Sequence, residues 1–217
     1  MVDHHAGEPG LLLARCWRGQ QTLDSLRSGL EHVLVADSRP PMVFLHGDAV
    51  TGCSQQGWLD PLFAQAELHV CSASWQRRFP DGHPCAGQLS SLMRFWQRAL
   101  SARALIDANG QWHEPDQRRA WLLSYRGDQT AMARREALEL VMAGASLDLD
   151  LIVFFEAAAL ASFQPEDLAA WSQLGEQELA GLIADPALVG RVCLSGLTAI
   201  DPPALAALGQ QRALLGI

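Results

Sequence analysis

The stretch that decides the fold is Leu11-Leu-Leu-Ala-Arg-Cys-Trp17, a short apolar run typical of a buried β-strand. Thr22 follows a polar turn and is predicted to cap a helix, because apolar residues then recur at spacings of three and four: Leu23, Leu26, Leu30, Val33 and Leu34. Pro40-Pro41 ends this helix, and Met42-Val-Phe-Leu-His46 is predicted as a second strand. Strands that alternate with helices favour a parallel sheet covered on both faces.

The same pattern returns in the second half of the chain. Ala120-Trp-Leu-Leu-Ser-Tyr125 is strand-like, Thr130 is predicted to cap the next helix, and Leu151-Ile-Val-Phe-Phe155 matches the second strand. Each half then continues through a helix-like stretch to a predicted third strand, which ends at Cys71 in the first half and at Cys193 in the second. In the second half that helix-like stretch carries Leu174, Leu179, Leu182 and Ile183.

This repeat predicts two domains, residues 1–110 and residues 119–217. Between them, Asp107 to Arg118 is interpreted as a linker because it holds Asn-Gly, a proline and charges without an apolar period. The predicted fold class is α/β, with two tandem three-layer α/β/α units, mainly parallel sheets and a pseudo-duplicated architecture.

Composition narrows the possible functions. Of the 217 residues 49% are hydrophobic, which provides for a sizeable core. The net charge of −8 makes direct binding of nucleic acid a poor expectation. All 16 cationic residues are arginine, and the absence of lysine excludes Schiff-base catalysis and a P-loop lysine.

The cysteines and the N-terminus suggest a cytoplasmic protein. The stretch from Met1 to Pro9 is polar and acidic and lacks the apolar region of a signal peptide. No apolar run approaches the roughly 18 residues needed to span a bilayer, so no membrane association is expected. The chain has five cysteines, an odd number, without a CxxC pair, and in the cytoplasm these are expected to remain thiols.

Cys71 is the candidate reactive residue, because ligands of open parallel sheets collect at the carboxyl ends of the strands. Ser72 and Ser74 are expected to cap a following helix, and Arg77 and Arg78 lie one to two turns further on. Amides and cations both lower a thiol pKa, and the thiolate is the nucleophile. Asp48, at the end of the second strand, is expected at the same rim.

Two other readings of these residues stay open. A cysteine without a disulfide is often buried and acts as a small hydrophobe, which is also the interpretation for Cys16 and Cys193. His69-Val-Cys71 and His83-Pro-Cys85 contain ligands that zinc accepts, but their spacing is not that of known zinc sites. The sequence therefore predicts neither a metal nor a cofactor, and Cys53 and Cys85 are interpreted as incidental loop residues.

Two segments carry a resemblance to a known family. Val43-Phe-Leu-His-Gly-Asp-Ala-Val50 and Val70-Cys-Ser-Ala-Ser-Trp-Gln-Arg-Arg78 resemble the DsrE/TusD-type subunit of the sulfur-relay family, with matches at Asp48, Cys71, Ala73, Arg77 and Arg78. In the second half, Arg134-Arg-Glu-Ala-Leu-Glu139 and Leu149-Asp-Leu-Ile-Val-Phe-Phe155 resemble the sister DsrF/TusC-type subunit. The resemblance extends from about Leu11 to Ile217, as if two family subunits were fused in one chain.

The resemblance implies a sulfur carrier that holds sulfane sulfur as a persulfide on Cys71 and relays it to a partner protein. It further implies an upstream sulfur donor, a small DsrC/TusE-like acceptor, and either a DsrH/TusB-like subunit or a homo-oligomer. The pathway would be tRNA thiolation or dissimilatory sulfur metabolism, and sulfurtransferase-like activity is left open. The alternative is a non-catalytic assembly or regulatory module of the same fold that binds a sulfur-relay partner, which a buried and unreactive Cys71 would favour.

The second half departs from the family pattern at its site. Ala158 stands at the acidic position, and Cys193 is followed by an apolar setting that is expected to raise its thiol pKa: Leu194, Gly196, Leu197 and Ile200. The halves are therefore predicted to have diverged into an active and a supporting site. A limiting dose of iodoacetamide is accordingly expected to label Cys71 before Cys193.

Overall fold

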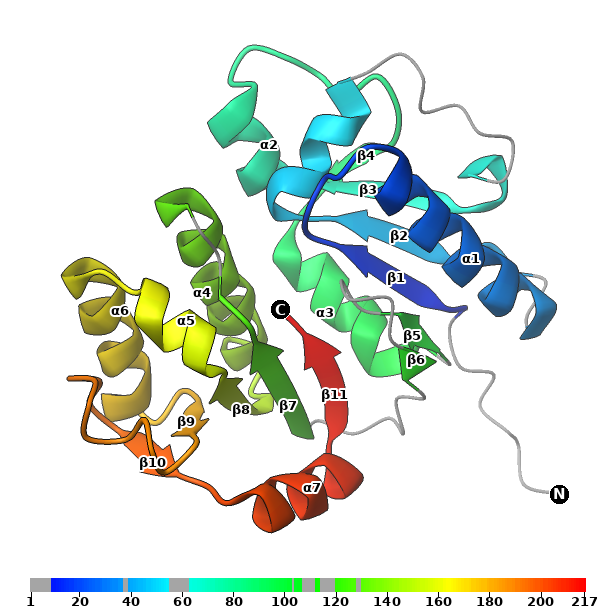
Figure 1. Cartoon of the computed structure of the whole chain (residues 1–217). Coiled ribbons are helices and arrows are strands. Elements are labelled where there is room, and N and C mark those ends of the chain that lie inside the picture. The colour runs from blue at the N-terminus through cyan, green and yellow to red at the C-terminus, as the bar shows by residue number, and fades with distance from the viewer. Residues whose placement is uncertain are drawn as a thin grey trace, which may run out of the picture. The chain divides into compact units, whose positions relative to one another are not determined.

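The computed structural model describes residues 9–36, 39–54, 63–102, 104–106, 112–113, 120–127 and 130–217. The chain divides into two compact units, Met1–Gln117 and Arg118–Ile217. Figure 1 shows that strands and helices alternate along both units. Among the described residues, no helix is both long enough and apolar enough to cross a membrane.

The first unit is built on a sheet with the strand order β4-β3-β2-β1-β5-β6. Neighbouring strands are parallel from β4 to β5, and only β6 runs antiparallel, beside β5. The bounds are β1 Leu11–Ala14, β2 Met42–Leu45, β3 Glu67–Cys71, β4 Gln88–Ser90, β5 Leu105–Ile106 and β6 Trp112–His113. Every residue of β1 and β2 is buried, as expected for central strands of a parallel sheet.

Two helices cover opposite faces of this sheet. Helix α1 (Gln20–Ala36) covers one face. Its Gly29 lies against Leu12 and Ile106, which are register partners in the sheet, and a Cβ added to Gly29 would be only 2.8 Å from the Leu12 side chain. On the other face, the ring of Phe44 in β2 packs in a tilted arrangement against the ring of Phe95 in α3 (Leu92–Ser101), with 5.3 Å between the ring centroids. Since Phe44 pairs with Leu13 rather than with Leu12, it belongs to the opposite face. The unit therefore has three layers, and its helices are α1 Gln20–Ala36, η1 Gly47–Ser54, η2 Phe63–Gln65, α2 Ser72–Arg78 and α3 Leu92–Ser101.

The second unit has an all-parallel sheet with the order β10-β9-β8-β7-β11. Its bounds are β7 Ala120–Tyr125, β8 Asp150–Phe155, β9 Gly181–Ala184, β10 Leu197–Ala199 and β11 Ala213–Gly216. Counted along each unit, the fourth, third, second, first and fifth strands lie side by side in both sheets. A different order in the two units would have contradicted a duplicated architecture, and the order is the same.

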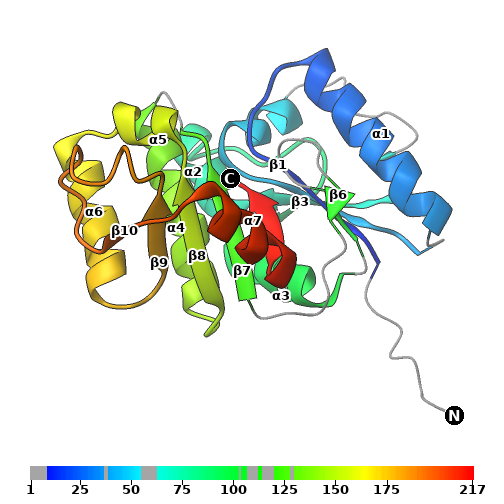
Figure 2. The same cartoon turned by 60° about the horizontal axis from the view of Figure 1, so that its bottom comes forward.

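Helices also flank the second sheet. Trp171 of α6 packs edge-on against Phe155 of β8 at 5.0 Å and stacks on Tyr125 of β7 at 5.9 Å. Figure 2 shows helix α7 in front of the second sheet. Gly209 of α7 lies near Leu214 of β11, and Leu122, the register partner of Leu214, faces away from Tyr125. Both units are thus α/β, with a mainly parallel sheet in the first and an all-parallel sheet in the second. The helices here are α4 Ala131–Ala145, α5 Ala157–Ser162, α6 Pro165–Glu176 and α7 Pro202–Gln211.

Several predicted boundaries are wrong. Helix α1 begins at Gln20, so Thr22 is not its cap; the Thr22 hydroxyl accepts a hydrogen bond from the Arg18 backbone and donates to the Cys16 carbonyl. The third strand of the second unit ends at Ala184, not at Cys193, which is exposed in the segment between β9 and β10. Leu182 and Ile183, predicted as helical, form this strand, because α6 already ends at Glu176.

Candidate functional site

A row of polar and sulfur-bearing residues lies at the carboxyl edge of the first sheet. Cys71 is the last residue of β3, and Val70 before it pairs with Leu45 of β2. His46 follows Leu45, and its backbone N–H donates to the carbonyl of Ala14, the last residue of β1, at 2.9 Å. Cys71 and His46 therefore occupy adjacent positions across the edge where open parallel sheets bind their ligands.

The next position along this edge belongs to Arg15. Its side chain is only 6% exposed, and its carbonyl accepts the backbone N–H of Ala49 at 3.0 Å. On the opposite side of Cys71, β4 contributes Ser90, the register partner of Cys71. The strands β1, β2, β3 and β4 are neighbours in the sheet. The residues at or just after their carboxyl ends therefore form one row: Arg15, His46, Cys71 and Ser90.

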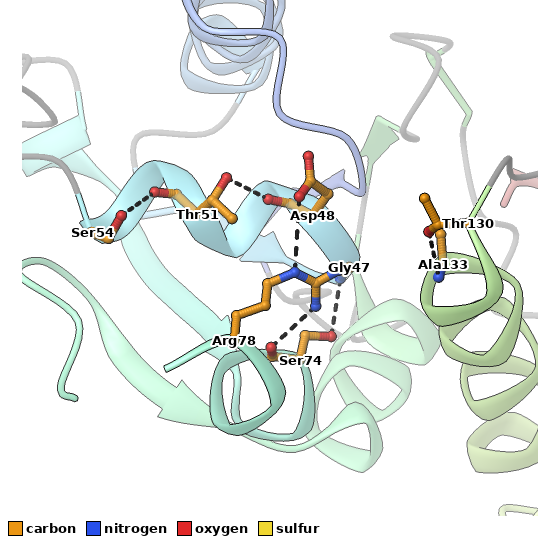
Figure 3. A network of polar contacts seen from close by, with 8 residues as sticks. All are labelled: Gly47, Asp48, Thr51, Ser54, Ser74, Arg78, Thr130 and Ala133. Carbon is orange, nitrogen blue, oxygen red and sulfur yellow. Dashed lines mark hydrogen bonds and ion pairs between the residues drawn. The ribbon is translucent and has the colours of Figure 1, made fainter. Parts of the chain in front are cut away.

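Gly47 turns the chain at the end of β2 and directs it into η1. Its φ of 61° is in the left-handed region, which glycine adopts without a steric penalty from a Cβ. Within η1, the Thr51 hydroxyl donates to the Asp48 carbonyl at 2.8 Å and the Ser54 hydroxyl donates to the Thr51 carbonyl at 2.7 Å (Figure 3). These local bonds hold the segment that presents Asp48 to solvent.

Helix α2 begins at Ser72, directly after Cys71, which is its N-cap residue and makes no side-chain capping hydrogen bond. The prediction that Ser72 and Ser74 cap this helix is wrong, because both lie inside it. Ser74 instead connects two elements: its buried hydroxyl accepts the backbone N–H of Gly47 at 3.1 Å (Figure 3). This bond fixes α2 against the turn that follows β2.

Arg78 and Asp48 meet above this turn. The Arg78 Nε lies 3.8 Å from the Asp48 Oδ1, and an Arg78 guanidinium N–H also donates to the Ser74 carbonyl at 3.1 Å (Figure 3). The Arg78 side chain is 12% exposed and the Asp48 side chain 56% exposed, so the pair lies at the boundary between interior and solvent. The structure therefore places these two predicted site residues together.

His46 is one of two residues of this edge, with Arg15, that sequence reasoning misses. Its side chain is fully buried, and neither ring nitrogen has a hydrogen-bond partner among the described residues. Burial lowers the pKa of His46 well below its usual value, and the positive charges of Arg15, Arg78 and Arg77 lower it further. At neutral pH the imidazole is therefore uncharged, and Arg15, Arg78 and Arg77 lie close enough to His46 for their charges to oppose its protonation.

Signals for the two overlooked residues exist in the sequence. Arg15 and His46 each follow a continuous apolar run directly, at the position where a parallel strand delivers its next side chain to the ligand-binding edge. The sequence pattern assigns Arg15 and His46 to the ends of the predicted first and second strands and gives neither of them a role in the site. The rule that places Cys71 at the edge places these two residues there as well.

Cys71 is buried, with 1% of its side chain exposed. Cys53 is also fully buried, whereas Cys16, Cys85 and Cys193 are exposed, and none of the five, all of which lie among the described residues, forms a disulfide. The apolar setting predicted for Cys193 is therefore wrong: Leu194 turns inward with 6% exposure while Cys193 faces solvent.

This burial reverses the expected order of alkylation. In the native protein, iodoacetamide is expected to modify Cys193 at least about tenfold faster than Cys71, because reaction at Cys71 requires local opening. Peptide mass spectrometry after a limiting dose measures both sites, and labelling in urea provides the unfolded control. Faster labelling of Cys71 in the native state would contradict this expectation and would indicate a strongly activated thiolate at an edge that opens readily.

The histidines considered as metal ligands are in different environments. His69 is buried, its Nε2 lies 3.0 Å from the Gln88 Nε2, and burial lowers its pKa. His83 is exposed, as is Cys85. In the described part of the chain, no three His, Cys, Asp or Glu side chains are grouped so that they could hold a metal ion.

The corresponding edge of the second unit is different. Ala184 is the last residue of its third strand, the position that Cys71 holds in the first unit. After β7 and β8, Arg126 Nε and Glu156 Oε1 form an ion pair at 3.2 Å, and the Ser124 hydroxyl donates to the same carboxylate oxygen at 3.2 Å. This edge contains an internal ion pair and no thiol at the end of its third strand.

Comparisons with protein-family models, curated proteins and solved structures found no match to this chain.

Proposed function

We propose that this protein is a sulfur carrier of the DsrE/DsrF-like type, with Cys71 as the residue that accepts and donates sulfane sulfur. The observation that carries the proposal is the position of Cys71 at the carboxyl edge of β3, beside His46 and within the edge to which Arg15, Arg77 and Arg78 contribute positive charge. A thiolate and a persulfide are both anions, and nearby cations stabilise them.

The chemistry is two successive displacements at sulfur. The Cys71 thiolate attacks the terminal sulfane sulfur of a donor persulfide, a new S–S bond forms, and the donor leaves as a thiolate. A thiol of the acceptor protein then attacks the outer sulfur of the Cys71 persulfide, which restores the Cys71 thiolate. In each displacement one S–S bond breaks and one S–S bond forms, so no external oxidant is needed.

The second unit serves as the supporting half in this proposal. The common strand order of the two sheets supports an origin by duplication, and Ala184 at the position of Cys71 supports loss of the thiol from the second site. Partners of the proposed carrier are an upstream sulfur donor and a DsrC/TusE-like acceptor in the cytoplasm. A DsrH/TusB-like subunit or a second copy of the chain completes the assembly.

One observation favours a second function. Cys71 is 1% exposed, which is the environment of a packing residue as much as that of a reactive one. A non-catalytic assembly or regulatory module would keep the same fold and would use its charged rim, including Asp48 and Arg78, to bind a sulfur-relay partner. The two functions differ in whether Cys71 ever carries sulfur.

Intact-mass analysis after incubation with a low-molecular-weight persulfide donor separates them. The wild-type protein is expected to gain about 32 Da, the mass of one sulfur atom, and peptide mapping is expected to place it on Cys71. The Cys71→Ser variant should lose this species, while the matched variant Cys193→Ser should retain it. If the Cys71→Ser variant still gains the sulfur, or if only exposed cysteines carry it in the wild type, the carrier function of Cys71 is wrong.

A double variant tests the role of the cations. Replacing Arg77 and Arg78 with glutamine is expected to slow persulfide formation on Cys71 about fivefold to tenfold, because two positive charges near an anionic sulfur are lost. Labelling of Cys193 in the same sample provides the internal control, since its rate should not change.

A further inference from the structure

Two cysteines outside the carboxyl edge lie side by side. Cys53 is in the last turn of η1 and is fully buried, whereas Cys85 is in the segment between α2 and β4 and is exposed. The backbone N–H of Cys85 donates to the Cys53 carbonyl at 3.0 Å. The Cys85 Sγ lies 3.9 Å from the carbonyl oxygen of Ser54, the residue after Cys53. Both the backbone and the sulfur of Cys85 therefore contact the segment that carries Cys53.

This geometry suits a disulfide. In a hydrogen-bonded residue pair of antiparallel strands, which exchanges two backbone hydrogen bonds, the α-carbons are about 5.5 Å apart. One such backbone bond joins Cys85 to Cys53, so their α-carbons are held at a comparable separation. Disulfides span α-carbon separations of about 4.4 to 6.8 Å. A bridge between Cys53 and Cys85 would therefore require side-chain rotation and little movement of the backbone.

The two thiols have different reactivities. Burial raises the pKa of Cys53 to about 12, and the neighbouring Cys85 thiol raises it as well. Cys53 is therefore protonated and unreactive at neutral pH, and a soluble reagent meets the exposed Cys85 first. An exposed thiol with a second cysteine beside it is a common arrangement in redox-sensing sites, where the second cysteine resolves the mixed disulfide.

We propose that Cys53 and Cys85 form a dithiol–disulfide site that reacts with low-molecular-weight disulfides. The Cys85 thiolate attacks the disulfide RSSR, a mixed disulfide forms, and one RS⁻ leaves and takes up a proton. Cys53 then loses its proton and attacks the Cys85 sulfur, which forms the Cys53–Cys85 bond and releases the second RSH. Two protein thiols are oxidised, one RSSR is reduced to two RSH, and no other reactant is needed.

A Cys53–Cys85 disulfide would affect the Asp48–Arg78 ion pair at the carboxyl edge of the first sheet. Cys53 closes η1, the segment that presents Asp48, and Cys85 follows α2, the helix that presents Arg78. A covalent link between these segments would restrict separation of Asp48 from Arg78, and with it the opening that reaction at the buried Cys71 requires. Oxidation of this site is therefore expected to slow reactions at Cys71.

Incubation with oxidised glutathione, without any sulfane sulfur, tests the site independently of the sulfur-carrier function. Non-reducing peptide mapping of the wild type should recover Cys53 linked to Cys85, about 2 Da lighter than the two unlinked thiol peptides. The exposed Cys16 and Cys193 can add glutathione but are not part of this linked pair. The Cys53→Ser variant should instead stop at a stable glutathione adduct on Cys85. The Cys85→Ser variant should leave Cys53 unmodified, and the Cys16→Ser and Cys71→Ser variants should form the bridge normally.

Three results would overturn the proposal: a glutathione adduct on Cys85 of the wild type that does not convert to a bridge, a bridge from Cys85 to a cysteine other than Cys53, or modification of Cys53 in the Cys85→Ser variant. If Cys53→Ser does not fold, the buried hydroxyl is avoided with Cys53→Ala. These results do not depend on the sulfur-carrier function, because the glutathione experiment contains no sulfane sulfur and the Cys71→Ser variant is expected to form the same bridge. A failure of persulfide formation at Cys71 would therefore not affect this test.

Discussion

Replacing Asp167 with alanine is expected to lower the free energy of unfolding by about 3 to 5 kcal/mol, because the change removes a carboxylate that is paired with the buried guanidinium of Arg134. The Arg134 Nε and the Asp167 Oδ2 are 2.6 Å apart, and the two side chains are 7% and 16% exposed. This ion pair joins α4 to α6, so its loss weakens the packing of both helices on the second sheet.

Asp167 has a second role in the same unit. Its carboxylate also accepts the backbone N–H of Gln164 at 2.9 Å, as part of a capping box at the start of α6. Loss of such a cap costs about 1 kcal/mol by itself. The Asp167→Asn variant retains an acceptor for this cap but not the charge, so it separates the capping contribution from that of the buried ion pair.

A neighbouring ion pair on the same helix provides the control. Arg135 Nε and Glu139 Oε1 are 3.1 Å apart, but Arg135 is 71% exposed, and exposed pairs contribute less than about 1 kcal/mol. The Glu139→Ala variant should therefore change stability little. Urea unfolding of the three variants and the wild type measures the difference. If Asp167→Ala and Glu139→Ala lower the free energy of unfolding equally, burial of Arg134 does not determine how much its ion pair contributes to stability.

Unfolding of the wild-type protein is expected to become easier as the pH falls below about 6.5, and His46 is expected to account for a slope of up to about 1.4 kcal/mol per pH unit. Burial and the charges of Arg15, Arg78 and Arg77 hold the pKa of His46 well below that of an unfolded histidine. Above pH 6.5 both states carry a neutral imidazole. Below pH 6.5 (roughly the pKa of an unfolded histidine), His46 binds a proton in the unfolded state but stays neutral in the folded state. The free energy of unfolding therefore decreases as the pH falls toward the folded-state pKa of His46.

The His46→Gln variant isolates this contribution. Urea unfolding at intervals between pH 7.5 and 5 (roughly the histidine range) is expected to show a shallower slope in the variant than in the wild type. His69, whose pKa burial also lowers, remains in both proteins and contributes equally to both slopes. The exposed His83 supplies the control variant, His83→Gln. A wild-type slope that His46→Gln leaves unchanged would contradict the neutral, buried state of His46.

The local elements of this fold follow from sequence patterns. The strand predicted at Ala120–Tyr125 has exactly the observed bounds, and the Thr130 hydroxyl accepts the backbone N–H of Ala133 as predicted for a helix cap (Figure 3). Thr22 looked equally suitable, but the helix there begins two residues earlier, at Gln20, after Gly19 with a φ of 58°. A capping residue type does not by itself specify the position of the first helical turn, because a turn ahead of it can start the helix.

The second half shows where one-dimensional reasoning fails. Cys193 was assigned to a third strand because Val192 and Cys193 follow a helix-like stretch, whereas the strand is the short Gly181–Ala184 segment directly after α6. Apolar residues in a short run fit a helix and a strand equally well, and pairing with β8 decides between them. Pairs of adjacent arginines present the same problem, since Arg134 is buried against Asp167 while Arg135 is exposed.

The sequence by itself determined the alternation of strands and helices, the α/β class, and the positions of Cys71, Asp48 and Arg78 near strand ends or helix ends, because these depend on apolar periodicity over neighbouring residues. Only the tertiary structure decided which strand ends are adjacent, and hence that Arg15, His46 and Cys71 form one edge and that Cys53 contacts Cys85. It also decided burial, which leaves Cys71 enclosed and Cys193 in solvent. Burial and cross-strand adjacency are relations between residues distant in the chain, and long-range packing fixes them rather than local pattern.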